Sequence, residues 1–192
     1  MGPLKDIKVI EFSGIGPGPY CGMLLADMGA EVIRVSKKGT EGLENKFDIH
    51  NRSKRSITAD LKNASTVTEI LKLIDQVDAV IEGFRPGVME KLGLGPDICI
   101  ERNPKLVYGR MTGWGQNGPM SNLAGHDINY LSLCGVSSYS GTKENGPVLS
   151  GLQIADITGG SFHAVTGILA SVINREKTGK GEYIDISMMD GS

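Results

Sequence analysis

The stretch Ile7-Lys8-Val9-Ile10-Glu11-Phe12, followed closely by Gly14-Ile15-Gly16-Pro17-Gly18-Pro19, decides how this chain is expected to fold. Residues 7–12 form a short run rich in β-branched side chains, which is typical of a buried strand. Residues 14–19 form a turn of glycine and proline, and proline suits the start of a helix, which we expect over residues 20–28. Strand, tight turn and helix in this order indicate the first half of a βαβ unit.

The same alternation of strand and helix patterns continues along the chain. Further strands are expected at residues 31–35, 57–61, 79–83, 106–111 and 183–188. Helices are expected at about residues 65–74, from His126 or Asp127 onward, and at about residues 158–174, with polar loops at 112–123 and 137–150. Strands that alternate with helices pair in parallel through right-handed crossovers. The predicted fold class is therefore α/β, a Rossmann-like open, mostly parallel sheet with helices on both faces.

Composition narrows the classes of partner. The chain has 192 residues, 40% of them hydrophobic, and a formal net charge of −2, so no global field would recruit nucleic acid or an anionic membrane. Its three cysteines are scattered, which favours reduced thiols in a cytoplasmic protein. No apolar run approaches the roughly 20 residues that span a bilayer. We therefore expect a cytoplasmic protein without nucleic-acid or membrane partners.

The first turn only partly matches a dinucleotide-binding fingerprint. The pattern GxGxxG would place its third glycine at position 19, where Pro19 stands. The next strand ends in Arg34-Val35-Ser36, with no acidic residue for a ribose. The GxxxxGK[ST] phosphate loop is also absent from the sequence. We therefore interpret the turn as a tight crossover and predict no nucleotide cofactor.

A basic cluster follows the second expected strand. It comprises Arg52, Lys54 and Arg55, with Arg34, Lys37, Lys38 and Lys62 nearby in sequence. We expect these residues at or after the ends of the second and third strands, and open parallel sheets bind ligands outside the carboxyl ends of their strands. A site for a phosphorylated ligand and an ordinary solvated surface are both compatible with this pattern.

Two titratable residues stand at expected helix starts. His126 lies in Gly125-His126-Asp127-Ile128-Asn129-Tyr130, and Asp156 precedes Gly159-Gly160. Either residue could simply cap its helix. If the fold brings the two together, they would instead form a site with an acid and a base.

Several multi-residue motifs, spread in order over the whole chain, resemble the family III CoA-transferases (the CaiB/BaiF-like superfamily). The motifs are Val9–Pro19, Asp27–Val35, Thr58–Lys62, Phe84–Val88, Thr112–Pro119, Ala155-Asp156 with Gly159-Gly160, and Thr178–Gly181. Within the superfamily, the segment from Gly125 to Tyr130 is similar to the α-methylacyl-CoA racemase branch, because transferases typically lack histidine at the position of His126.

The resemblance implies a racemase that inverts the α-carbon of 2-methylacyl-CoA thioesters through an enolate, with His126 and Asp156 as the two proton carriers. It implies no cofactor and no metal, since acyl-CoA is the substrate. Backbone N–H groups near Asp127 are the expected support for the enolate oxygen. With the basic cluster included, the expected CoA contacts are Lys37, Arg52, Lys54, Arg55, Ala59, Asp60, Leu61, Lys62, Gly83, Phe84, Arg85, Lys91, Gly125, His126, Asp127, Ile128, Asn129 and Tyr130.

The resemblance also bears on the extent of the chain. Family members are about twice as long, so residues 1–192 are expected to form an incomplete CoA-binding large domain whose smaller partner domain follows residue 192. The full-length form is expected to be an interlocked homodimer. The 192 residues alone are expected to bind CoA weakly at best, to show little racemase activity, and to self-associate or aggregate. Two alternatives stay open. One is a CoA-transferase with Asp156 as nucleophile, and the other is a truncated, inactive CoA-binding half.

Overall fold

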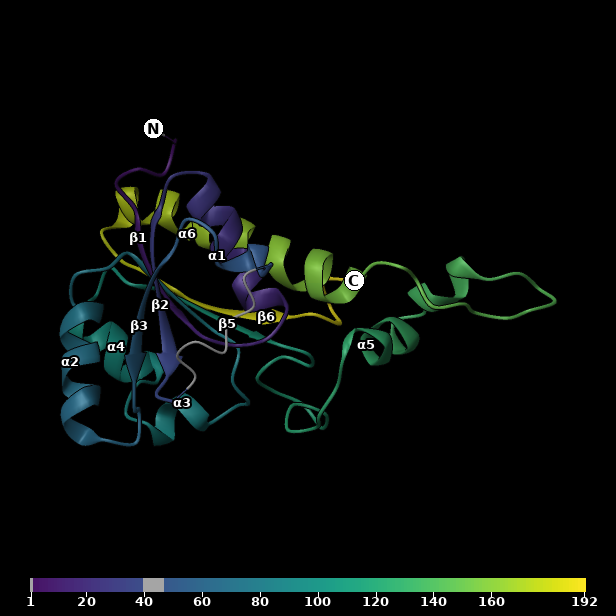
Figure 1. Ribbon diagram of the computed structural model, residues 1–192, viewed down its shortest axis with the longest axis horizontal. Helices are drawn as coiled ribbons and strands as arrows, with labels where there is room; N and C mark the ends of the chain where they lie inside the picture. The colour runs from purple at the N-terminus through teal and green to yellow at the C-terminus, as the bar shows by residue number, and fades with distance from the viewer. Residues whose placement is uncertain (1, 40–46) are drawn as a thin grey trace.

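A single six-stranded sheet, parallel throughout, organises the computed structural model, which describes residues 2–39 and 47–192 (Figure 1). The strands are β1 (Lys8–Phe12), β2 (Glu31–Lys37), β3 (Arg55–Ala59), β4 (Ala79–Glu82), β5 (Val107–Thr112) and β6 (Tyr183–Ser187). They lie in the order β3-β2-β1-β4-β5-β6, and every neighbouring pair is parallel. The predicted fold class is confirmed, and each predicted strand is present.

Helices cover both faces of the sheet. On one face lie α1 (Pro17–Asp27) and α6 (His163–Thr178), and on the other lie α2 (Ala64–Ile74), α3 (Val88–Lys91) and α4 (Pro96–Arg102) (Figure 1). Helices α3 and α4 were not predicted from the sequence. The two helices have four and seven residues, which is too short for a helical repeat of apolar residues to be recognised in the sequence.

Strand β1 illustrates why the central strands are rich in apolar residues. Val9 packs in the apolar cluster beneath α1 and α6, whereas Ile10 and Phe12 pack in the cluster beneath α2 and α4. A strand covered on both faces needs apolar side chains at successive positions. Glu11 is the exception, since it is fully buried between the sheet and α1.

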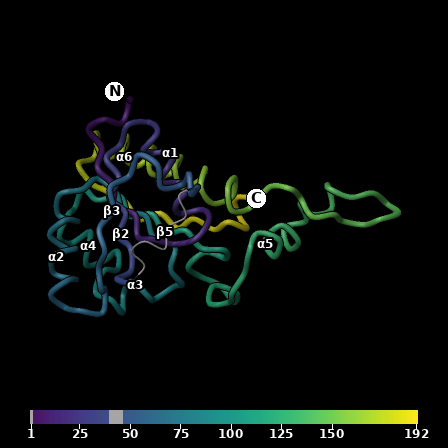
Figure 2. Tube along the Cα trace, viewed as in Figure 1, coloured from purple at the N-terminus to yellow at the C-terminus, as the bar shows by residue number. Residues whose placement is uncertain are grey.

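An arm projects from the body of the domain. It leaves α5 (Asp127–Leu133), passes through a 3₁₀ turn at Val136–Ser140 and folds back through an isolated antiparallel bridge between Thr142 and Gly146. Figure 2 shows the arm extending well beyond the sheet and its helices. Its exposed apolar side chains include Tyr139, Leu149 and Leu152.

The segment that carries Asp156 differs from the prediction. Asp156 does not cap a helix that begins at residue 158. It lies in the first turn of η3, a π-helix over Ala155–Phe162, which leads directly into α6. Single π-turns are uncommon and often occur at functional sites. Among the described residues, no helix is long and apolar enough to cross a membrane.

Candidate active site

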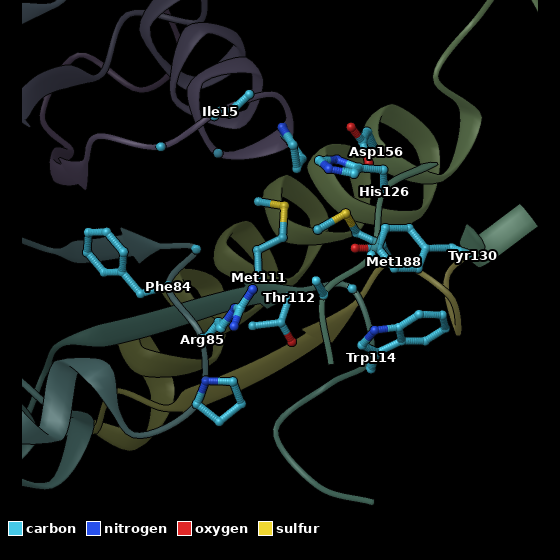
Figure 3. Close-up of a pocket in the computed structure, with 18 of the residues that line it drawn as sticks. Ile15, Phe84, Arg85, Met111, Thr112, Trp114, His126, Tyr130, Asp156 and Met188 are labelled. Atoms are coloured by element: carbon cyan, nitrogen blue, oxygen red, sulfur yellow. The ribbon is translucent and has the colours of Figure 1, made fainter. Parts of the chain in front are cut away.

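A cavity of about 430 Å³ opens at the carboxyl edge of the sheet (Figure 3). Its walls come from the turn after β1, the loop after β4 and the segment after β5, together with His126, Tyr130, Asp156 and Met188. In the strand order found here, β1 and β4 are neighbours whose crossovers run in opposite directions. Such a switch point leaves a crevice at the carboxyl ends of the strands, so the topology itself creates this site.

Asp156 borders the cavity beside the first turn of the chain. A Cβ atom on Gly16 would lie 3.1 Å from Oδ2 of Asp156, and the φ of Gly16 is 69°. Glycine is therefore favoured at position 16 by both its backbone conformation and the approach of the carboxyl. Burial, reinforced by the negative charge of Asp127, raises the pKa of Asp156 above its ordinary value, while the charge of His126 acts in the opposite direction.

The start of α5 places His126 and Asp127. The main-chain N–H of His126 donates to Oδ1 of Asn129 over 2.9 Å, which fixes the first turn of this helix. Oδ1 of Asp127 accepts a hydrogen bond of 3.0 Å from the main-chain N–H of Asp156. The His126 ring borders the same cavity as the Asp156 carboxyl (Figure 3). The fold thus brings the two titratable residues predicted from the sequence to one site.

The amino terminus of α1 faces the cavity but carries few donors. Pro17 and Pro19 lie in its first turn and have no N–H, so Gly18 is left to offer one between them. Pro17 and Gly18 both line the cavity. A carboxylate beside an ordinary helix start would gain several hydrogen bonds, whereas this start favours ionised Asp156 only weakly.

Tyr130 and Trp114 form one wall. Their rings meet edge to face with centroids 4.8 Å apart. A Cβ on Gly113 would lie 2.2 Å from the Tyr130 hydroxyl, and one on Gly125 would lie 2.6 Å from the Tyr130 ring. Burial, with smaller contributions from Asp156 and Asp127, raises the pKa of Tyr130 to about 12. Tyr130 therefore stays neutral and can offer an O–H at the cavity.

A buried carboxylate supports the opposite wall. Oε2 of Glu82 accepts a hydrogen bond of 2.7 Å from the N–H of Phe84, and Oε1 pairs with Nε of Arg110 over 2.6 Å. Glu82 is fully buried, and Arg110 also pairs with Glu90. This network holds the loop after β4, whose residues Gly83, Phe84 and Arg85 line the cavity.

The basic cluster is placed differently from the prediction. Arg52 pairs with Asp27 at the carboxyl end of α1, about 15 Å along the helix axis from Pro17. Arg55 begins β3 and pairs with Glu31 at the start of β2. Both arginines therefore lie at the amino edge of the sheet, and the expectation that they follow the ends of strands is wrong. Lys37 ends β2 at the carboxyl edge, so these arginines lie at the opposite edge of the sheet from the residue that precedes them in the basic cluster.

Lys54 forms a buried ion pair inside the domain. Its ammonium donates to Oε2 of Glu11 over 2.6 Å and to the carbonyl of Pro19 over 2.8 Å, and its side chain is 1% exposed. Burial lowers the pKa of Lys54 and raises that of Glu11, while their mutual attraction opposes both shifts. In this conformation the Lys54 ammonium is bound inside the domain and does not face the cavity.

The remaining predicted CoA contacts lie at or near the carboxyl edge. Lys37 ends β2 opposite Ala59, the last residue of β3, and Asp60, Leu61 and Lys62 follow directly. Lys91 ends α3, just after the loop that contains Arg85. Ile128 and Asn129 lie in the first turn of α5, beside Gly125 and His126. Of these cations, Arg85 lines the cavity, whereas Lys37 and Lys62 lie at the carboxyl ends of β2 and β3.

Several residues that line the cavity were not predicted from the sequence. Phe12, Met111, Thr112, Trp114 and Met188 border the cavity but were not among the predicted site residues. Phe12 and Thr112 end β1 and β5, and Met188 follows β6, so their positions at strand ends were the available signal. Within the described parts of the chain, no three histidine, cysteine, aspartate or glutamate side chains converge to hold a metal ion.

Comparison with known proteins relates the chain to one family. The model for the CoA-transferase family III matches residues 4–192. Mouse α-methylacyl-CoA racemase is 44% identical over 189 residues, which are 98% of this chain and 49% of the mouse protein. The succinate–glutarate CoA-transferase of Agrobacterium fabrum is 34% identical over 206 residues, covering 98% of this chain and 51% of its own length.

Solved structures agree with the sequence relatives. The crystal structure of a CaiB/BaiF family protein from Brucella suis superimposes with a TM-score of 0.90 at 32% identity, covering 98% of this chain and 54% of that one. The chain thus spans about half the length of the relatives it matches. Because the family model covers almost the whole chain and the fold agrees, the chain belongs to the CoA-transferase family III.

Proposed function

We propose that this chain carries the acid–base site of an α-methylacyl-CoA racemase, which inverts the α-carbon of 2-methylacyl-CoA thioesters without a cofactor. The observation that carries the proposal is the position of His126 and Asp156 on one cavity, at the switch point of the sheet. The 44% identity to a racemase supports it, against 34% to the transferase of A. fabrum.

The reaction requires one proton to leave the α-carbon and another to return on the opposite face. Histidine is suited to accept a proton near neutral pH. Asp156 can deliver one because burial raises the pKa of its carboxyl, and because Pro17 and Pro19 remove donors that would favour its ionised form. The two residues exchange roles when the opposite enantiomer reacts.

Between the two transfers, negative charge moves to the thioester oxygen. The first N–H groups of α5, near Asp127, have no acceptor within the helix and are our candidates for holding this enolate oxygen. The CoA moiety would extend along the carboxyl edge of the sheet, and its phosphates would bind the basic side chains of Arg85, Lys37 and Lys62. Binding energy from CoA then holds the α-carbon between the carriers.

The whole protein is proposed to resemble its longer relatives. We propose that a second, smaller domain and an interlocked homodimer close the cavity, and that the protein acts in cytoplasmic fatty-acid metabolism. Closure would exclude water and sharpen the placement of the α-carbon.

A CoA-transferase is the second candidate, because transferases are also among the relatives of this chain. A nucleophilic Asp156 would need to be ionised, which the raised pKa of its carboxyl opposes.

One experiment distinguishes the racemase from the CoA-transferase. The full-length protein that carries this chain is incubated in D₂O with a 2-methylacyl-CoA and an unrelated free carboxylic acid. The racemase exchanges the α-proton with the thioester intact, whereas CoA transfer to the acid without α-exchange would establish the transferase.

A further inference from the structure

Ser161 lies five residues after Asp156, within the π-helix, and its side chain is completely buried. Its hydroxyl lies 2.9 Å from the carbonyl oxygen of Pro17 and 3.1 Å from the carbonyl oxygen of Asp156, so its single hydrogen is shared between these two acceptors. One hydroxyl thus joins the first turn of α1 to the peptide of the proposed proton carrier.

The two ends of this link lie beside the reacting carboxyl. Pro17 directly follows Gly16, which the Asp156 carboxyl approaches closely. The second acceptor of Ser161 is the peptide oxygen of Asp156 itself. The Ser161 hydroxyl therefore limits how far the Asp156 carboxyl can move from the Gly16 turn.

The neighbouring glycines show how closely these segments pack. A Cβ on Gly160 would lie 3.0 Å from Sδ of Met111 and 3.1 Å from Cβ of Pro17, and one on Gly159 would lie 2.3 Å from the carbonyl oxygen of Met188. The π-helix is thus pressed between α1 and the end of β6, and its small residues leave little freedom for Asp156 to shift.

We propose that Ser161 is a positioning residue of this site, whose hydroxyl holds the Asp156 carboxyl against the Gly16 turn. The inference rests on the proposed function. Carbonyl oxygens have two lone pairs and can still accept helical N–H groups when the hydroxyl is lost, so its removal leaves the fold largely intact. The placement of a proton carrier, by contrast, affects the rate of proton transfer steeply.

The test compares Ser161→Ala with Ser171→Ala in the full-length protein. Ser171 is also a buried serine of the same helical run, on α6, and donates to Oε2 of Glu182 over 2.7 Å away from the cavity. It therefore controls for the loss of a buried hydroxyl. Ser161→Cys, which is nearly the same size but a weaker donor, serves as a second variant should the alanine variant fail to fold.

We expect Ser161→Ala to lower kcat for α-deuterium exchange by roughly 10- to 100-fold, a part of what an acid–base group contributes, and to leave KM within about 2-fold. The loss should be larger for the enantiomer whose proton Asp156 removes than for the one that His126 serves. Ser161→Cys should fall between the wild type and the alanine variant. Ser171→Ala should leave both kinetic parameters unchanged.

A second readout does not depend on activity. The ¹³C resonance of the Asp156 carboxyl gives its pKa directly. Ser161→Ala should shift that pKa while Asp127 and His126, the charged groups that act on it, remain in place. If the proposed function is wrong, the wild type will show no α-proton exchange. The titration of Asp156 would still test the role of Ser161 in that case. An unchanged Asp156 pKa, or equal kcat in an active Ser161→Ala enzyme, would overturn the inference.

Discussion

Oδ1 of Asp127 accepts a hydrogen bond from the main-chain N–H of Asp156 over 3.0 Å, which joins the start of α5 to the start of the π-helix at the rim of the cavity. Asp127 thereby has two effects on its neighbour. It fixes the Asp156 backbone through a hydrogen bond, and its charge helps to raise the pKa of the Asp156 carboxyl.

Two substitutions at Asp127 separate these effects. Asp127→Asn keeps an oxygen that can accept the N–H of Asp156 but removes the charge, so the pKa of Asp156 should fall. In the direction of reaction in which Asp156 acts as the acid, the alkaline limb of the pH–rate profile should therefore move to lower pH. Asp127→Ala removes the hydrogen bond as well and should also lower the maximal rate. Identical pH profiles for wild type and Asp127→Asn would show that this charge does not tune the site.

The raised pKa of Asp156 also predicts how stability depends on pH. In the range between the unfolded and the folded pKa values, the folded protein binds the proton more tightly, so the free energy of unfolding falls as pH rises through that range. Asp156→Asn removes this cost and should raise Tm at pH 7 relative to wild type. The gain should shrink at a pH below the ordinary aspartate value, where Asp156 is protonated in both states. Thermal denaturation at the two pH values measures the difference, and a gain of equal size at both would refute the linkage.

Much of the fold could be predicted from short patterns of apolar residues, glycine and proline in the sequence. The central strands β1, β4 and β5 are short and almost fully buried, and Pro17 at the start of α1 marks the first crossover. The positions of Arg52 and Arg55 could not be predicted, because the sequence does not reveal which edge of the sheet they reach. The π-helix could not be predicted either, because it depends on how Gly159 and Gly160 pack against distant segments.

The positions of the basic residues lead to a matched test of CoA binding. Arg85→Gln and Lys62→Gln, at the carboxyl edge, should each weaken the binding of free CoA by roughly 2- to 5-fold at low ionic strength, as expected for exposed charge pairs. The effect should fade as salt rises. Arg52→Gln and Arg55→Gln remove the same charge at the amino edge and should leave CoA affinity unchanged. Calorimetric titration of the four variants measures this, and equal losses at both edges would contradict the placement of the phosphates.

The buried pair of Lys54 and Glu11 predicts a stability effect without a binding effect. Lys54→Met leaves Glu11 buried and unpaired, and should lower the free energy of unfolding by roughly 3–5 kcal/mol. The double variant Glu11→Leu/Lys54→Met should recover most of that loss, because two apolar side chains do not leave an unpaired charge. Urea denaturation gives the energies. A Lys54→Met protein of normal stability but impaired CoA affinity would instead assign Lys54 to the ligand.

The central claim is that His126 and Asp156 transfer protons on opposite faces of one α-carbon, and enantiomer-resolved exchange in D₂O tests it most directly. The full-length wild type should interconvert both enantiomers of a 2-methylacyl-CoA and introduce deuterium at the α-carbon of each. His126→Ala and Asp156→Ala should each lose inversion by about 10²–10⁴-fold while still exchanging one enantiomer, a different one in each variant. Near-normal inversion by either variant, or CoA transfer without α-exchange in the wild type, would contradict the account.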